Sequence, residues 1–403
     1  MKRFFAFTLA IVAAIILTAC GGKGSAASSP ANVVATAGDT TAIVTWNMQP
    51  GVEYWVYSAQ GTGITPQNCI SMVYCRTAVN VTSPFVLSGL VNGVTYSVTI
   101  DSRVNKGPGG PGSASIQVTP ALAGAIWSTG TSLGGNDLHG LAYGGLFAAV
   151  GDNGALFNSI DGNAWTAVAN PAPYANLNAV IFYSGKYIAV GSGGVILASP
   201  DGVTWTQQNS GTTNDLYAIT GNGLGGFVAV GANGTIINST AGAIWTTVTS
   251  NTSSSLYGVT YGNSTFVAVG ASGTLLTSTD GASWQAPSFL PAYDLKGVVY
   301  AAGSFVAVGD NGTLVTSPDG SNWVAQNQIS STLLTAVTYG HQFVAVDSAG
   351  NIYNSPDGVN WILVQTIPSA LYAVLPAQYL AGQYLGGYVY SAVGGSGANI
   401  LSQ

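Results

Sequence analysis

The chain has 403 residues, of which 47% are hydrophobic, 5% are charged and 55 are glycine, and its formal net charge is −6. This length exceeds what one hydrophobic core serves, so we expect two domains or a repeat architecture. Scarce Glu, Lys and Arg beside many aromatic residues favour an all-β fold and exclude a nucleic-acid-binding protein, while the apolar content excludes disorder.

Residues 1–19 are typical of an export signal. The basic Met1-Lys2-Arg3 precedes an apolar stretch, Phe4–Leu17, which ends at Leu17-Thr18-Ala19-Cys20. A membrane-spanning anchor is the alternative, but the stretch is short for it.

The residues Leu17-Thr18-Ala19-Cys20 resemble the lipobox of bacterial lipoproteins. The resemblance implies that Cys20 is lipidated and that the lipid alone holds the protein on the cell envelope. Gly21 in place of Asp favours the outer membrane, on its periplasmic or surface side, in a Gram-negative cell, whereas in a Gram-positive cell the protein would stay on the cell membrane. The sequence GGKGSAASSP predicts that residues 20–30 are a flexible linker.

Residues 31–120 contain short alternating strands, which predict a β-sandwich. Trp46 and the run Leu90–Tyr96 resemble the fibronectin type III domain. The resemblance implies that Trp46 packs between two sheets and that the Tyr96 hydroxyl bonds the backbone of the preceding corner. Such a domain serves as a spacer or an adhesive module.

Cys69 and Cys75 remain after Cys20 is set aside. An even number of cysteines in an exported chain predicts a disulfide between them. A metal site is not indicated, because no His, Asp or Glu lies between Asn68 and Arg76.

Residues 121–403 repeat one unit of four predicted strands. Seven tryptophans mark the repeat at spacings of 38 to 40 residues: Trp127, Trp165, Trp205, Trp245, Trp284, Trp323 and Trp361. This period indicates a β-propeller or a solenoid. The last unit stops before its Trp strand, and Trp127 has no unit before it. We therefore predict a seven-bladed propeller closed by strand exchange, with six or eight blades only if Pro376–Gly387 is misinterpreted.

A Ser-x-Asp-Gly-x-x-Trp motif recurs in the repeat and resembles the Asp-box, or BNR repeat, of sialidase-like propellers. The resemblance implies a structural turn between the third and fourth strands, on the face opposite the usual binding face. Its aspartates are Asp161, Asp201, Asp280, Asp319 and Asp357, and Ala241 replaces Asp in one unit.

Sialidase activity is excluded, because residues 121–403 contain no Arg and no Glu for the carboxylate clamp and the catalytic pair. The histidines His139 and His341 are predicted to lie far apart, which argues against a metalloenzyme or a nucleophilic triad. A polysaccharide hydrolase or lyase that uses Asp residues remains the alternative function.

One position on the predicted inner strand varies in polar and aromatic character and would line a central channel. Its residues, which we term the channel ring, are His139, Asn178, Tyr217, Tyr257, Lys296, Thr335 and Tyr372. The rim nearby would carry Asp137, Asp215 and Asp294 in the loops that lead into blades, and Asp152, Asp310 and Asp347 with Asn153, Asn233 and Asn311 in turns. These residues are either ordinary turn and channel residues or a site for a polar ligand, a sugar or a weakly bound cation.

The sequence as a whole predicts a non-enzymatic binding or scaffold lipoprotein. We expect a monomer with a protein or carbohydrate partner, and neither a cofactor nor a structural metal. Photosystem II assembly factors have a similar propeller with a basic patch, and two Lys without Arg in residues 121–403 do not support that role.

Overall fold

The computed structural model describes residues 25–289, 291–380 and 383–402, so the export signal and Cys20 lie outside the described residues. The chain divides into two compact units, Met1–Ala121 and Leu122–Gln403. The fold is all-β, and no helix of the described part is long and apolar enough to cross a membrane.

The first unit consists of two antiparallel sheets. One joins β1 (Ser25–Ala26), β7 (Tyr96–Val104), β4 (Val52–Gln60) and β5 (Arg76–Val81), with β8 (Ile116–Val118) also on β7; the other joins β2 (Val34–Gly38), β3 (Thr41–Thr45) and β6 (Phe85–Leu87). Trp46 is buried in the core with Tyr54, Val56 and Ile100. The Tyr96 hydroxyl accepts a hydrogen bond from the Val91 N–H at 3.1 Å, as the corner-tyrosine prediction requires.

The predicted linker differs from the structure over its second half. Ser25–Ala26 forms β1 and pairs with Val104 and Arg103 of β7, and the Ser102 hydroxyl donates to the Ser28 carbonyl at 2.6 Å. The edge of β7 leaves backbone groups unpaired, and the small residues of this segment satisfy them. Composition indicates flexibility but does not show which sheet edge needs a partner.

The predicted disulfide between Cys69 and Cys75 is confirmed, with a Cα–Cα distance of 5.3 Å. Cys69 begins the short helix η1 (Cys69–Ser71) and is buried against Tyr57, Ala59 and Ile64. The loop that the disulfide closes exposes Ile70, Val73 and Tyr74 to solvent.

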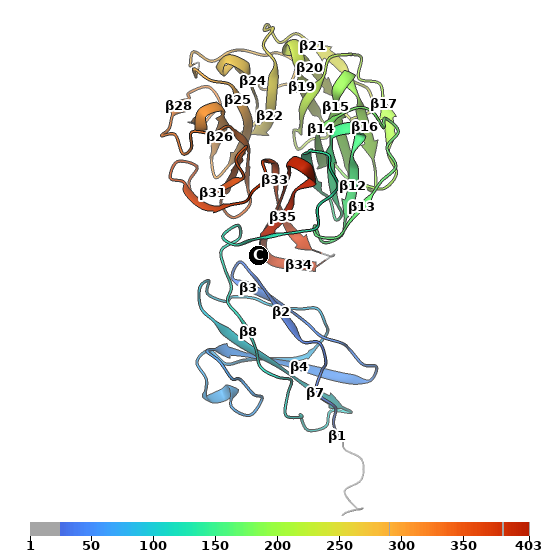
Figure 1. Ribbon diagram of the computed structural model, residues 1–403, viewed down its shortest axis with the longest axis vertical. Coiled ribbons are helices and arrows are strands. Elements are labelled where there is room, and N and C mark those ends of the chain that lie inside the picture. Colours follow the sequence, from blue (N-terminus) through green and yellow to red (C-terminus); the bar gives the residue numbers. More distant parts are fainter. Residues whose placement is uncertain (1–24, 290, 381–382, 403) are drawn as a thin grey trace, which may run out of the picture. The chain divides into compact units, whose positions relative to one another are not determined.

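The second unit has a propeller-like fold, in which the described residues form seven antiparallel sheets. We number these sheets as blades 1 to 7 (Figure 1). Blade 1 contains β10 (Leu138–Tyr143), β11 (Phe147–Gly151), β12 (Leu156–Ser159) and β13 (Trp165–Ala167); blade 2 contains β14 (Leu177–Tyr183), β15 (Lys186–Gly191), β16 (Ile196–Ser199) and β17 (Thr206–Gln208); blade 3 contains β18 (Leu216–Gly221), β19 (Phe227–Gly231), β20 (Ile236–Ser239) and β21 (Thr246–Val248).

Blade 4 contains β22 (Leu256–Gly262), β23 (Thr265–Gly270) and β24 (Leu275–Ser278); blade 5 contains β25 (Leu295–Ala301), β26 (Ser304–Gly309), β27 (Leu314–Ser317) and β28 (Val324–Ala325); blade 6 contains β29 (Leu334–Tyr339), β30 (Phe343–Asp347), β31 (Asn351–Ser355) and β32 (Ile362–Thr366). Blade 7 contains β33 (Leu371–Leu380), β34 (Gln383–Gly394), β35 (Asn399–Ser402) and β9 (Trp127–Thr129). Single 3-10 turns, η2 (Asp152–Gly154), η3 (Ser192–Gly194), η4 (Ala232–Gly234), η5 (Ala271–Gly273), η6 (Asp310–Gly312) and η7 (Gly395–Gly397), join the second and third strands of every blade except blade 6.

Blade 4 lacks a full fourth strand. Its outer edge is reduced to the bridge between Thr277 and Gln285. Pro287 follows two residues later, and proline has no N–H to continue the pairing.

The inner strands of the seven blades follow one another around a closed ring. Each first strand contacts the first strand of the next blade, and β33 of blade 7 contacts β10 of blade 1. The outer edge of blade 7 is β9, which pairs with β35 in the register Ser402 to Trp127 and Ile400 to Thr129. The strand that begins the unit thus completes the blade that ends it, as the interrupted repeat predicted.

The core of this unit lies between neighbouring blades. In one typical cluster, Val267 and Leu275 of blade 4 pack with Leu295, Phe305 and Trp323 of blade 5. Because each apolar side chain is buried by a neighbouring blade, a blade gains most of its stability from being held in the ring.

We expect replacement of Trp127 by Ala to cost about 3 kcal/mol, since the side chain is buried against Tyr390 and its Nε1 donates to the Gly124 carbonyl at 2.8 Å. Urea unfolding followed by circular dichroism measures this loss. Trp323→Ala is the matched control: it should lose similar stability, but only Trp127→Ala should make residues 122–133 sensitive to protease under native conditions. A loss below about 1 kcal/mol, or equal protease resistance of both variants, would contradict the role of β9.

Candidate functional site

The seven channel-ring residues occupy equivalent bulges in the seven inner strands. In β10 the pairing jumps from Leu138–Gly151 to Gly140–Val150, which leaves His139 unpaired, and the same shift occurs in every blade. A β-bulge re-aims the side chain of its extra residue. This local geometry turns one side chain per blade into the channel.

The residue that follows each bulge is Gly or Ala because the neighbouring inner strand lies against it. A Cβ on Gly140 would come within 2.9 Å of the Val180 nitrogen, and one on Gly258 within 2.9 Å of the Lys296 carbonyl oxygen. The predicted crowding at the centre of the ring is therefore present.

The channel ring lines a cavity of about 290 Å³. All seven residues of the predicted ring contribute to its wall, together with the small residues that follow them. Each of the seven is partly exposed, although the Asn178 amide donates to the Leu216 carbonyl at 2.8 Å and the Thr335 hydroxyl to the Leu371 carbonyl at 2.6 Å. The structure thus brings together a set that is spread over more than 230 residues of sequence.

One side of the channel is formed by blades 3, 4 and 5. The rings of Tyr217 and Tyr257 lie 5.6 Å apart at an angle of 42°. The Lys296 ammonium lies 3.8 Å from the centre of the Tyr257 ring and 2.9 Å from Asp294. The hydrogen bond from the Ser272 N–H, and then that from Lys296, lowers the pKa of Asp294. Lys296 is therefore held between an aromatic face and a carboxylate.

The opposite side spans blades 7 and 1. The rings of His139 and Tyr372 lie 5.4 Å apart, and His139 Nε2 is 2.9 Å from Asp152 Oδ1. Burial and then the negative charge of Asp137 raise the pKa of Tyr372. No other charged partner of His139 is found among the described residues.

The three aspartates of the loops that lead into blades hold the turns of the preceding blades. The Oδ1 atoms of Asp137, Asp215 and Asp294 accept hydrogen bonds at 2.8 Å from the Ser396, Gly193 and Ser272 N–H groups. Each bond joins neighbouring blades, which gives these carboxylates a structural role that the sequence did not reveal. We name this side of the unit, which carries the leading loops and the turns after the second strands, the loop face.

Asp347 does not belong to the rim, and its placement there was wrong. It is the last residue of β30, where each of the other six blades has Gly, and it is fully buried. Burial would raise the pKa of Asp347, but hydrogen bonds from Thr332 and Asn351 outweigh burial and lower it.

The rim asparagines Asn153, Asn233 and Asn311 have φ values of 52° to 55° within their turns, a conformation that Asn tolerates.

No three His, Cys, Asp or Glu side chains within the described ranges lie close enough to hold a metal ion.

The Asp-box residues satisfy the backbone of their own turns. In blade 5, Asp319 Oδ1 accepts from the Ser321 and Asn322 N–H groups at 2.9 and 2.8 Å, and Ser317 Oγ accepts from Gly320 at 2.9 Å. These amide bonds lower the pKa of Asp319 to about 2. The boxes lie on the opposite side of the unit, which we name the box face.

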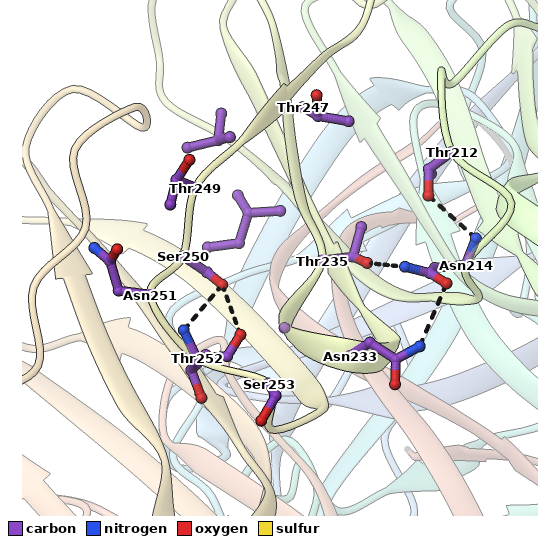
Figure 2. A pocket seen from close by; sticks show the side chains of 13 residues that line it. Thr212, Asn214, Asn233, Thr235, Thr247, Thr249, Ser250, Asn251, Thr252 and Ser253 are labelled. Carbon is purple, nitrogen blue, oxygen red and sulfur yellow. Dashed lines mark hydrogen bonds between the residues drawn. The ribbon is translucent and has the colours of Figure 1, made fainter.

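A second cavity, of about 550 Å³, was not predicted (Figure 2). It is lined by hydroxyl and amide side chains from η4 and from loops on the loop face of blade 3, among them Asn214, Asn233, Thr235, Ser250 and Thr252. Figure 2 shows that these groups bond one another, as in the 2.8 Å contact from Asn214 to Thr235. In the sequence, this cavity could have been predicted only from two Ser- and Thr-rich loops that occupy equivalent positions in two repeats. The lining has neither a charged nor an aromatic side chain, so the channel offers the stronger recognition chemistry.

Residues 146–257 match the family model described as the DUF6242 beta propeller domain. No curated protein sequence is similar enough to the chain to count as a match.

Several solved structures share the propeller fold. YCF48 bound to D1 peptide is 18% identical with a TM-score of 0.55, covering 68% of this chain and 94% of its own. YCF48 from Cyanidioschyzon merolae is 17% identical with a TM-score of 0.54, covering 69% and 98%. A catalytically inactive virginiamycin B lyase from Staphylococcus aureus with quinupristin is 10% identical with a TM-score of 0.61, covering 69% and 99%. At identities of 10% to 18%, these structural similarities show a shared fold alone. That fold occurs both in a peptide complex and in a lyase.

Replacement of Ala241, the box position that lacks a carboxylate, by Asp should raise the melting temperature of the unit at pH 7 by roughly 2 °C, because the new carboxylate accepts two turn amides. The folded pKa of such an Asp lies below its unfolded value of about 3.9. The stabilisation is therefore complete above about pH 4 and is lost as the pH falls toward about 2. Thermal unfolding from pH 7 to pH 2 measures the gain. Ala243→Asp adds the same charge outside the box position, and an equal gain there would contradict the mechanism.

Proposed function

We propose that the chain is a cell-envelope lipoprotein whose propeller is a non-catalytic binding module for a protein partner. The seven sheets are the blades of a single seven-bladed propeller of the BNR type, and the first unit is a fibronectin type III domain that spaces it from the lipid on Cys20. The observation that carries the binding role is the partly exposed aromatic ring set in the channel, Tyr217, Tyr257 and Tyr372.

The loop face around the channel also exposes aromatic side chains. Tyr174 is 93% exposed and Tyr293 is 44% exposed, each in a loop that leads into a blade. Tyrosine is enriched at protein interfaces because it supplies a large rigid face and a hydroxyl. The exposed apolar residues of the box face, such as Ile160, Val203 and Ile244, are aliphatic. We therefore assign the loop face as the binding face.

The YCF48 complex supports a protein ligand, since a propeller of the same fold is bound there to a peptide. A carbohydrate ligand is the alternative. An Asp-dependent polysaccharide enzyme is less well supported, because one oxygen of each of Asp137, Asp215 and Asp294 already accepts a turn amide, and the other oxygen of Asp294 is paired with Lys296.

Combined replacement of Tyr217 and Tyr257 by Ala should lower capture of the partner at least tenfold, because it removes two stacking faces from the channel. Photo-crosslinking from the loop face of the full-length chain in its own cells, followed by mass spectrometry, measures capture. Leu224→Ala with Ile244→Ala, on the box face, is the control and should leave capture unchanged. Equal loss in the control pair, or binding to a glycan array without any protein crosslink, would contradict a protein partner.

Replacement of Cys20 by Ala should move the full-length protein from the membrane fraction to the soluble fraction, because it removes the lipid attachment site. Cell fractionation and the mass of the mature N-terminus measure the change. The double variant Cys69→Ala, Cys75→Ala removes the other two cysteines and should stay on the membrane. Membrane retention of Cys20→Ala would refute the lipoprotein assignment.

A further inference from the structure

The loop that the disulfide closes, Cys69–Cys75, packs on the outer face of the sheet that contains β1, β4 and β7. Side chains alternate along β4, so Tyr54 and Val56 enter the core between the two sheets while Tyr57 points outward. Cys69 is buried against Tyr57. We name this segment the disulfide loop. One side of it is fixed to the sheet by packing and by the disulfide.

The exposed side of the disulfide loop is apolar. Ile70 is 91% exposed, and more than half of the surface of Val73 and of Tyr74 is exposed as well. No charged residue occurs between Gly61 and Cys75. Tyr74 is held at a φ of 53°, a conformation that costs free energy for a residue with a bulky side chain. Apolar side chains fixed in this way indicate a contact with something outside the chain.

The N-terminal segment enters the same sheet beside this loop. Ser25–Ala26 forms β1 and pairs with β7 (Figure 1), and the Ala27 N–H donates to the Ser102 carbonyl at 3.1 Å. Gly110 lies between the two segments. Its carbonyl accepts a hydrogen bond from the Gln67 side chain at 3.4 Å, and a Cβ on Gly110 would lie 3.4 Å from the Ala27 carbonyl oxygen. The segment after β1 and the flank of the disulfide loop therefore contact the same residue.

The chain leaves little length between the proposed lipid and this sheet. Cys20 is five residues before Ser25, and five extended residues span at most about 18 Å. Because Ser25 is paired with Val104, a lipid on Cys20 holds this part of the first unit within that distance of the membrane interface. The bilayer is then the apolar phase closest to the disulfide loop.

The distribution of charge also fits a membrane beside the first unit. Residues 20–121 contain four basic and three acidic side chains, and one of the acidic ones, Asp101, is paired with Arg103 at 2.8 Å. Residues 122–403 contain two Lys and eleven Asp. A bilayer with anionic lipids attracts basic segments and repels acidic ones, so it accepts the first unit more readily than the second.

We propose that the disulfide loop is a membrane-contact site, in which Ile70, Val73 and Tyr74 lie in the interfacial layer of the bilayer that holds the lipid of Cys20. This inference rests on the lipoprotein part of the proposed function and adds a second point of attachment to it. Tyrosine is enriched at membrane interfaces, because its ring is apolar and its hydroxyl stays hydrated. The disulfide keeps the loop attached to the sheet, so less conformational freedom is lost when these side chains enter the bilayer.

The test uses the full-length lipidated chain in vesicles of phosphatidylethanolamine and phosphatidylglycerol, with and without brominated acyl chains. A fluorescent amino acid replaces Val73 in one variant and Val34 in another. Val34 is the matched control, because it is 54% exposed, against 61% for Val73, and lies on β2 in the other sheet. We expect brominated lipid to quench the probe at position 73 at least about threefold more than the probe at position 34, since an interfacial apolar side chain reaches the boundary of headgroups and acyl chains.

Ile70→Asp with Tyr74→Asp should reduce the quenching at position 73 to the level found at position 34, because two carboxylates would have to leave water. Val34→Asp with Thr36→Asp adds the same charge at exposed positions of β2 and should leave the quenching at position 73 unchanged. All four side chains are exposed, so circular dichroism should show the same fold in both variants. Equal quenching at positions 73 and 34, or quenching at position 73 that survives the first pair of substitutions, would overturn the inference.

The lipoprotein proposal and the loop contact fail separately. If Cys20→Ala releases the protein but the probe at position 73 is not preferentially quenched, the loop contact fails and the lipoprotein stands. If Cys20→Ala stays on the membrane while the probe at position 73 is quenched, the lipoprotein assignment fails and the loop contact stands.

Discussion

The pairing of β9 with β35 is the constraint on which the propeller-like unit and its site both depend. It joins segments more than 250 residues apart and brings blade 7 against blade 1. The contacts of the channel that cross this seam include His139 with Tyr372 and the hydrogen bond from Ser396 to Asp137. Closure therefore does more than remove a sheet edge, because it also assembles the part of the channel mouth that lies between blades 7 and 1.

Inside the closed ring, crowding decides what each inner strand presents. Gly140 and Gly258 lie so close to the next strand that a methyl group would meet its backbone. The bulged residue beside each small residue is then the one that points inward. Crowding at one position and variation at the next come from the same geometry, so the scaffold fixes where a side chain enters the channel without fixing which side chain it is.

Much of this was predictable from the sequence, because it depends on periodicity. The tryptophan spacing gave the repeat, the interrupted last unit indicated the exchange of β9, and the position after the leading Leu identified the channel ring. Contacts between blades were not predictable, since they depend on register: Asp137, Asp215 and Asp294 looked like free rim carboxylates but accept amides from the preceding blade. Asp347 was misplaced because blade 6 lacks the glycine and the 3-10 turn that align the other blades. The Ser25–Ala26 strand was missed because small polar residues carry no pairing signal.

Aspartate has two different roles in this unit, and the difference is one of unused hydrogen-bonding capacity. A box carboxylate such as Asp319 accepts two amides of its own turn and the side-chain amide of Asn322, which occupies both oxygens. Asp215 uses Oδ1 for the Gly193 amide, and its negative charge still acts on the Tyr217 ring. Asp319 is therefore satisfied within its own turn, whereas Asp215 retains negative charge beside an aromatic ring. A symmetric scaffold that carries His, Asn, Tyr, Tyr, Lys, Thr and Tyr at seven equivalent positions presents an asymmetric channel. Packing alone does not require that asymmetry, because the adjoining position takes only Gly or Ala in all seven blades, whereas the proposed binding of an asymmetric ligand would use it.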